Sequence, residues 1–220
     1  MGKNFDDMSK FRTVIVCEST ETGTDKRLIE TLIAEHSLLP NDSFTTVTRC
    51  PGDIQTVKDF LKYTLPKQTY IVSRETINIL VIVDADEKPK DRFQEIKQCF
   101  NKQIFAVQQS MEARLSKDKT RINVGIYLFP NNTRKGSLET FGLKVLKHSR
   151  LMSKLKCIDS YILCLGDKDG RITTNNKSKA KFRIFMATPY PDRYVSSIID
   201  SIDFNSSEFE KLKEFIKQAE

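Results

Sequence analysis

The sequence feature that most constrains the fold is an apolar segment at residues 77–86 that ends in two carboxylates. It reads Ile-Asn-Ile-Leu-Val-Ile-Val-Asp-Ala-Asp, so aliphatic residues occupy both sets of alternating positions. A run that is apolar on both faces is typical of a central strand in a parallel sheet. In open α/β sheets, ligands bind beyond the carboxyl ends of such strands. We therefore expect Asp84 and Asp86 to lie at the mouth of a ligand site.

The spacing of Asp84 and Asp86 predicts that both carboxylates point the same way, because residues two apart share one face of a strand. Two carboxylates on one face suit Mg²⁺, which takes one or two carboxylates and leaves positions for phosphate oxygens. The alternative is structural. In that interpretation Asp84 caps the helix that follows, and Asp86 is a solvated turn residue.

Strands and helices alternate along the first half of the chain. This is the βαβ signature of an α/β fold, a Rossmann-like sheet with a largely parallel core flanked by helices. If the first and third strands are neighbours, Glu18 lies close to Asp84 and Asp86, and three carboxylates favour a hard-cation site. The predicted elements are strands at Thr13–Cys17, Phe44–Thr48 and the central run; helices starting near Asp25, with Thr24 as N-cap, and near Ile54; and a third helix with Phe93, Ile96, Phe100 and Ile104 on its inner face.

The second half of the chain is predicted to add one buried strand, Ile122–Phe129, and several helices. Residues 179–187 fit both a strand and a helix, so the sequence leaves that segment open. We predict a polar N-terminal tail at residues 1–12, an α/β core at 13–150 and a helical C-terminal extension at 151–220 packed on the core. Val107, Met111 and Leu115 continue the helical spacing from Ile104, which predicts a long or a broken helix there. A further helix is expected to start at residues 136–139, followed by an apolar helix face with Leu151, Leu155, Ile158, Ile162 and Leu165 and by a loop at 166–178. The last helix is expected to begin with Ser207 and Glu210 as capping box.

Positive charge is concentrated in the second half of the chain. The formal net charge is +7, and residues 102–160 hold twelve Lys and Arg against four Asp and Glu. Within that region Lys144, Lys147 and Arg150 form a basic stripe on a predicted helix. A basic region that faces an acidic site suits a phosphate-bearing ligand, so we expect this stripe to contact nucleic acid, DNA or RNA. A merely solvated basic surface is the alternative.

Composition argues against several classes of protein. The five cysteines form no CxxC pair and the chain has two histidines, which leaves little for a zinc site, a disulfide framework or a serine triad. No apolar run approaches the ~20 residues that cross a membrane, and the N-terminus has no signal-peptide core. We therefore expect a cytoplasmic protein without membrane contact. Because the chain has no Walker A sequence, any NTP-driven step would belong to a partner such as an ATPase.

The order of the acidic residues carries a family resemblance. A strand ends in Glu18, Asp25 opens a helix after a glycine-containing loop, and another strand runs into Asp84-Ala85-Asp86. This order resembles the Toprim domain of topoisomerases, primases, recombination proteins and OLD-type nucleases. Nearly the whole chain looks like small stand-alone Toprim-like proteins of bacteria and archaea. The other matching pieces are Phe129-Pro130-Asn131, Gly136-x-Leu138-Glu139, Lys179-Ala180-Lys181, and Asp203-Phe204 followed by a helix.

The resemblance implies a Toprim-type fold and a role for each acid. Glu18 would be a general acid or base, or a metal ligand, and Asp84 and Asp86 would hold Mg²⁺, with Mn²⁺ as a substitute. Related nucleases also place a lysine near the metal, a role that Lys179 or Lys181 would fill here. The implied function is a Mg²⁺-dependent, nuclease-like phosphodiester enzyme that acts on nucleic acid.

The loop after Glu18 departs from the Toprim pattern. In the family the glycine directly follows the glutamate, whereas residues 19–22 separate Glu18 from Gly23 in this chain. With a longer loop, either the backbone approaches a phosphate less closely or Glu21 replaces Glu18 in part. This difference favours the alternative function, a non-catalytic Toprim-like binding or regulatory module that works with a partner protein.

Overall fold

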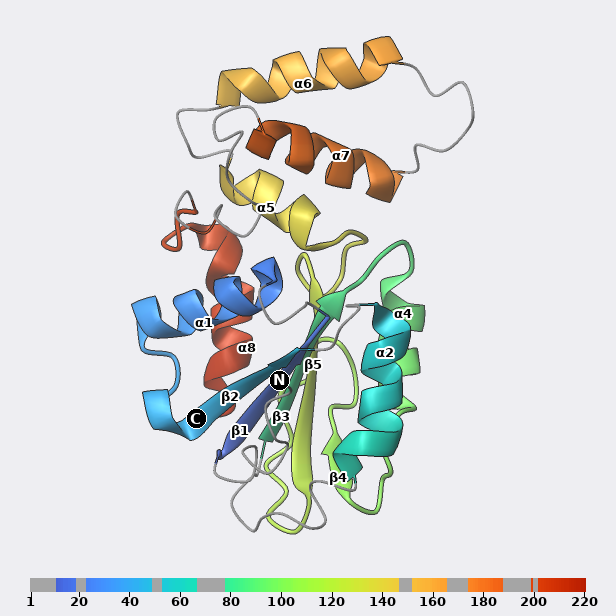
Figure 1. The fold of residues 1–220 in the computed structure, drawn as a ribbon. Helices are drawn as coiled ribbons and strands as arrows, with labels where there is room; N and C mark the ends of the chain where they lie inside the picture. The colour runs from blue at the N-terminus through green and yellow to red at the C-terminus, as the bar shows by residue number, and fades with distance from the viewer. Residues whose placement is uncertain are drawn as a thin grey trace, which may run out of the picture.

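A five-stranded sheet forms the centre of the structure, which is a computed structural model (Figure 1). It describes residues 11–18, 23–48, 53–66, 78–146, 152–165, 174–187, 199 and 202–220. The strands are β1 (Thr13–Cys17), β2 (Phe44–Thr48), β3 (Asn78–Asp84), β4 (Phe105–Val107) and β5 (Ile122–Phe129). Their order is β2-β1-β3-β5-β4, and every pairing is parallel. The predicted α/β, Rossmann-like sheet is confirmed, and its first and third strands are neighbours.

Helices cover both faces of this sheet (Figure 1). On one face lie α1 (Thr24–His36) and α8 (Glu210–Lys217). On the other lie α2 (Ile54–Asp59), which continues into the π-helical turn η3 (Phe60–Thr64), and α4 (Pro89–Lys97). The sheet is therefore the middle layer of three. The short 3₁₀ helices are η2 (Asn41–Ser43) and η5 (Ser207–Phe209).

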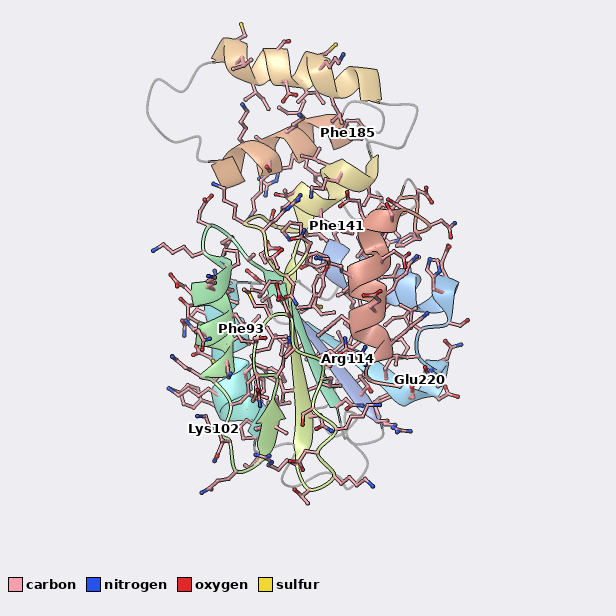
Figure 2. All side chains as sticks on the ribbon, turned by 180° about the vertical axis from the view of Figure 1, so that it is seen from behind. Phe93, Lys102, Arg114, Phe141, Phe185 and Glu220 are labelled. Atoms are coloured by element: carbon pink, nitrogen blue, oxygen red, sulfur yellow. The ribbon has the colours of Figure 1, made fainter. Side chains whose placement is uncertain are left out.

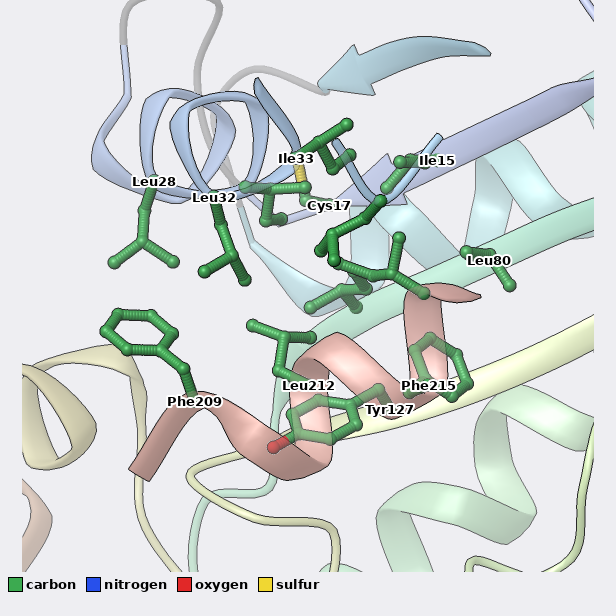
Figure 3. Close-up of a cluster of buried hydrophobic side chains, with 14 of the residues drawn as sticks. Ile15, Cys17, Leu28, Leu32, Ile33, Leu80, Tyr127, Phe209, Leu212 and Phe215 are labelled. Atoms are coloured by element: carbon green, nitrogen blue, oxygen red, sulfur yellow. The ribbon is translucent and has the colours of Figure 1, made fainter. Parts of the chain in front are cut away.

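Alternate residues of the central strands enter two separate hydrophobic cores. In β1, Ile15 belongs to the core under α1 and α8, whereas Val14 and Val16 belong to the core under α2 and α4. β3 and β5 follow the same rule, because successive side chains of a strand point to opposite faces. Figure 3 shows the first core, where Leu28 and Leu212 come from α1 and α8. The apolar run of β3 thus reflects burial on both faces, as a central parallel strand requires.

Three further helices lie beyond the carboxyl ends of the strands (Figure 1): α5 (Leu138–Leu146), α6 (Met152–Leu165) and α7 (Thr174–Ala187). They share a third core that includes Leu155, Ile158 and Ile162, the spacing expected from the sequence. The predicted C-terminal extension therefore has two parts, because α6 and α7 pack with α5 whereas α8 packs on the sheet. Phe182 and Phe185 also enter this third core from α7.

The undecided segment at residues 179–187 is helical. It forms part of α7, which begins at Thr174 and so occupies the end of the predicted loop at 166–178. Phe182 and Phe185 are both buried, and a helix places residues three apart on one face, whereas a strand would point them to opposite faces. The period-two alternation at this segment was therefore misleading.

Two predicted helix features were wrong near the edge of the sheet. α4 ends at Lys97 instead of continuing, and Phe105–Val107 forms the edge strand β4, paired with β5. A three-residue strand is too short to show a period in the sequence, so its pairing partner decides its structure. The Phe105 ring packs edge-on against Phe100, with ring centroids 5.2 Å apart, which fixes the turn between α4 and β4.

Helix starts also differ from the predicted caps by one residue. Gly23 is the N-cap of α1, where Thr24 was expected. At the last helix the capping side chain is that of Ser206, whose hydroxyl accepts a hydrogen bond from the Glu208 N–H, and the first turn is the 3₁₀ helix η5. Local signals place helix termini only to within one or two residues.

We expect Gly142→Ala to destabilise the protein by about 1–3 kcal/mol, the usual cost of overpacking. Alanine normally stabilises a helix by up to about 1 kcal/mol relative to glycine. A Cβ at Gly142 of α5, however, would lie 2.7 Å from Cε2 of Phe182, which is 2 % exposed. Chemical denaturation measures whether Gly142→Ala lowers or raises the free energy of unfolding. Adding Phe182→Leu to the variant should restore stability, and a stabilised single variant would contradict the close packing of α5 on α7.

Two observations concern disulfides and membrane spans, both of which the sequence argued against. The described cysteines, Cys17, Cys99, Cys157 and Cys164, are all free thiols. Among the described residues, no helix combines the length and apolar character that a membrane span needs.

Candidate functional site

Glu18 and Asp84 meet at the carboxyl edge of the sheet. Asp84 is the last residue of β3, and Glu18 directly follows β1, the strand paired with β3. Oε2 of Glu18 accepts a hydrogen bond from the Asp84 N–H at 3.4 Å. The sequence expectation that strand neighbours bring these two acids together is confirmed.

Two more acids join them from the first turns of helices. Asp25 lies at the start of α1 and Glu139 at the start of α5. Both are close enough to Asp84 for their negative charges to raise the pKa of its carboxyl group. Glu18, Asp25, Asp84 and Glu139 are called the acidic cluster below. All four are partly buried at a point where the sheet meets the layer of α5 and α7.

Burial is the main cause of raised pKa values in the acidic cluster. It raises the pKa of Glu18 to about 7, helped by the charges of Asp86 and Asp25 and opposed by the hydrogen bond from Asp84. It raises the pKa of Asp25 to about 6, helped by the charge of Glu139. The pKa of Asp84 is raised well above its usual value, again by burial first and then by its acidic neighbours. Ionising the whole cluster at neutral pH is therefore costly without added positive charge.

Asp84 is oriented by the first residue of α5, which begins at Leu138. Its Oδ1 accepts a hydrogen bond of 2.8 Å from the N–H of Leu138, the first residue of α5. The structural alternative for Asp84 was a cap of the helix that follows it, which is α4. Asp84 instead satisfies an orphan donor of a helix more than fifty residues later. This bond fixes the carboxylate and leaves Oδ2 for a ligand.

Asp86 does not share a strand face with Asp84, so this prediction was wrong. β3 ends at Asp84, and Asp86 has a left-handed backbone with φ of 52°. Its backbone pairs with Gly136, through N–H···O=C bonds of 2.9 and 2.8 Å. Its carboxylate forms an ion pair with Arg92 of α4. The turn thus directs Asp86 to the α4 side, while Asp84 faces α5, although the charge of Asp86 still acts on Glu18.

The two candidate lysines of α7 have different surroundings. The charge of Lys179 lowers the pKa of Asp25, which places its ammonium group near the acidic cluster. Lys181 forms an ion pair of 2.5 Å with Asp159 and so links α7 to α6. The charge effect of Lys179 on Asp25, and the ion pair that Lys181 already forms with Asp159, therefore favour Lys179 as the lysine of the site.

Of the three residues of the predicted basic stripe, the structure describes Lys144. Lys144 lies 3.8 Å from Glu208, so it faces the start of the C-terminal segment. Lys147 and Arg150 lie outside the described residues. Among the described residues, the stripe is therefore represented by a lysine that already has an acidic partner.

Sequence reasoning gave no site role to three residues of this region: Asp25, Glu139 and Arg92. The first two appeared only as parts of the Toprim-like pattern. Acids in the first turn of a helix are common because they complement the helix dipole, so Asp25 and Glu139 carried no distinct signal. Both follow strands of the same sheet, however, and the carboxyl ends of parallel strands share one edge. That rule brings Asp25 and Glu139 to the same edge of the sheet, but how near they lie to Asp84 also depends on the positions of α1 and α5. Arg92, six residues after Asp86, is found only once the helix start is known.

The donor chemistry of the acidic cluster fits a hard divalent cation that takes few protein ligands. No group of three or more His, Cys, Asp and Glu side chains in the described ranges is arranged to hold a metal ion. Glu18 and Asp84 form a pair, and Mg²⁺ often takes one or two carboxylates while water and phosphate fill its other positions.

Comparison with known proteins gives one result. No curated protein and no solved structure matches the chain. One protein family matches residues 15–220, from the middle of β1 to the last residue, and so spans the acidic cluster, the sheet and the helical layer. The chain belongs to this family, which is described as "Protein of unknown function (DUF3226)".

Proposed function

We propose that this protein is a Mg²⁺-dependent, nuclease-like phosphodiester enzyme of Toprim type that acts on nucleic acid. The observation that carries the proposal is the acidic cluster at the carboxyl edge of the parallel sheet, where Glu18 and Asp84 are joined by a hydrogen bond. Ligand sites of open α/β sheets lie at this edge. Carboxylates of raised pKa beside a lysine are typical of catalytic sites more than of structural ones.

Each residue of the cluster has a distinct part in this proposal. Asp84 and Glu18 would hold the cation, which when bound polarises the phosphoryl group and stabilises the leaving oxygen. Alternatively, Glu18 would act as a general acid or base instead of a ligand, because a carboxyl group with a pKa of about 7 exchanges a proton near neutral pH. Lys179 would contact a phosphate oxygen. Leu138 keeps Asp84 in place through its N–H.

Asp84→Asn is expected to weaken Mn²⁺ and Mg²⁺ binding about tenfold or more. The substitution keeps a carbonyl oxygen that can accept from Leu138, so the fold should survive while the charge is lost. Isothermal titration measures the affinity, and a plasmid-nicking assay, with single-stranded DNA and RNA alongside, measures cleavage. Far-UV circular dichroism checks that the variant is folded.

Asp91→Asn is the matched control, because Asp91 is an exposed acid of α4 outside the acidic cluster. It should bind metal as the wild type does. Asp86→Asn should have a smaller effect than Asp84→Asn, since Asp86 is already held by Arg92. Equal metal affinity in Asp84→Asn and wild type would rule out Asp84 as a ligand.

A second candidate function is a non-catalytic binding module that works with a partner protein, such as an ATPase. The ion pair between Asp86 and Arg92 favours it, because it neutralises one of the three acids expected to hold the metal. Metal binding that depends on Asp84 but brings no cleavage of any nucleic acid would support this module over the enzyme.

A further inference from the structure

A basic groove lies at the amino-terminal end of the sheet, opposite the acidic cluster. It consists of two adjoining cavities of about 390 and 380 Å³, whose linings share Ser116 and Arg121. The groove crosses the starts of the strands, because Arg12 precedes β1 and Arg121 precedes β5. The cations along it that matter here are Arg12, Lys102, Arg114, Lys117, Lys119 and Arg121.

Most of this positive charge is not neutralised within the described chain. Lys102, Arg114, Lys117 and Lys119 are exposed, and none of them forms an ion pair with another described residue. Figure 2 shows Lys102 and Arg114 on the half of the molecule that is remote from α5, α6 and α7. The exception is Arg121, which binds Asp118 at 2.6 Å. Apart from Asp118, the one acid among the described residues of the two linings is Glu220.

The layout of these cations fits a chain of phosphates better than one small anion. A single phosphate is held by donors that converge on one point, whereas these side chains are spread along two cavities. Cations in a row neutralise successive phosphates and release their counterions. The aromatic residue of the linings that could stack on a base is Phe105, and its ring is buried, being 1 % exposed. In the part of the chain that the structure describes, the groove can therefore contact a backbone but offers no stacking platform.

We infer that this groove binds the sugar-phosphate backbone of nucleic acid without reading its bases. The choice of nucleic acid over another polyanion rests on the proposed function. β5 runs from the groove at Asn123 to the acidic edge at Phe129, a rise of roughly 20 Å at 3.3 Å per residue. The groove is therefore a separate anchoring site that holds a strand whose other part reaches the acidic cluster.

The test is fluorescence anisotropy with labelled single-stranded and duplex DNA in the presence of a chelator, so that no metal contributes. The variant Lys102→Gln with Arg114→Gln should bind roughly tenfold more weakly, and each lost phosphate contact should reduce the slope of log affinity against log salt by about 0.9 on duplex DNA. Lys62→Gln with Lys156→Gln is the matched control. It removes the same charge from exposed lysines outside the groove and should bind within about twofold of wild type.

Three outcomes would overturn the inference. Equal weakening in both double variants would mean diffuse attraction instead of a groove. Unchanged binding in Lys102→Gln with Arg114→Gln would remove the groove from DNA binding. Tighter binding of labelled polyglutamate than of DNA would assign the groove to an acidic peptide. Loss of metal affinity in Asp84→Asn would still support the proposed function in any of these cases, so the two failures are distinguishable.

Discussion

Phe209→Ala is expected to lower the free energy of unfolding by about 3–5 kcal/mol, the largest effect of any single substitution considered. Phe209 is fully buried in η5, inside the core under α1 and α8. Its ring lies 4.8 Å from that of Phe141 in α5 and 5.3 Å from that of Phe204. Truncation removes both ring contacts and leaves a cavity that rigid neighbours cannot fill. Urea denaturation, followed by circular dichroism, measures the change.

Tyr63→Ala is the control for Phe209→Ala. It removes a ring of similar size, but Tyr63 is 55 % exposed, so the change should stay within about 0.5 kcal/mol. If Phe209→Ala lowered the free energy of unfolding by less than about 1 kcal/mol, the C-terminal segment, residues 202–220, would not be an integral part of the core. Figure 3 shows why we expect the larger value: Phe209 packs opposite Leu28 and Leu32, at the meeting point of α1 and the C-terminal segment.

Glu18→Gln is expected to raise stability at pH 8 and to remove much of its pH dependence below pH 7. The pKa of Glu18 is about 7 in the folded protein against an ordinary value of 4.5, so the folded state binds this proton more tightly than the unfolded state. Its stabilising contribution is fully present below pH 4.5 and is lost as the pH rises to about 7. The contribution of Glu18 to the free energy of unfolding therefore changes by roughly 3 kcal/mol at most over this pH range, because solvent screens a partly exposed group.

Unfolding by urea at several pH values in a chelator tests the Glu18 prediction. Wild type should lose stability between pH 4.5 and 7, with Asp25 adding to the slope in the same direction up to about pH 6. Glu18→Gln should show a flatter profile. Glu112→Gln, at an exposed glutamate, should keep the wild-type profile. A wild-type stability that rises through this range would mean that Glu18 is ionised in the folded protein at acidic pH.

The sheet was largely predictable because its strands carry strong local signals. β1, β3 and β5 are apolar on both faces because both faces are buried in a parallel sheet. This pattern can be recognised from the amino-acid sequence. β4 was not predictable, since three residues carry no period and its neighbour β5 sets its structure. The start of α7 was missed for a related reason: its first residues are polar, and the buried Phe182 and Phe185 lie a full turn or more later.

The sequence predicted the positions of Glu18 and Asp84 but not the arrangement of the acids around them. Glu18 and Asp84 follow from the strand ends once β1 and β3 are neighbours, a condition that the sequence left open and the structure meets. Asp86 was placed wrongly because its direction depends on one left-handed residue conformation and on Arg92, neither of which a motif records. Asp25 and Glu139 reach the cluster through helix positions, so they needed the three-dimensional arrangement of α1 and α5.

The bond between Asp84 and Leu138 has a consequence for how the molecule responds to charge. The acidic cluster draws Glu18 and Asp84 from the sheet but Glu139, and the nearby Lys179, from the layer of α5 and α7. Deprotonation therefore sets up repulsion across the junction between two layers, not within one rigid element. A cation held by Glu18 and Asp84, as proposed above, would reduce this repulsion. Proton release and cation binding would then be linked, so the packing of the helical layer on the sheet would depend on both pH and metal concentration.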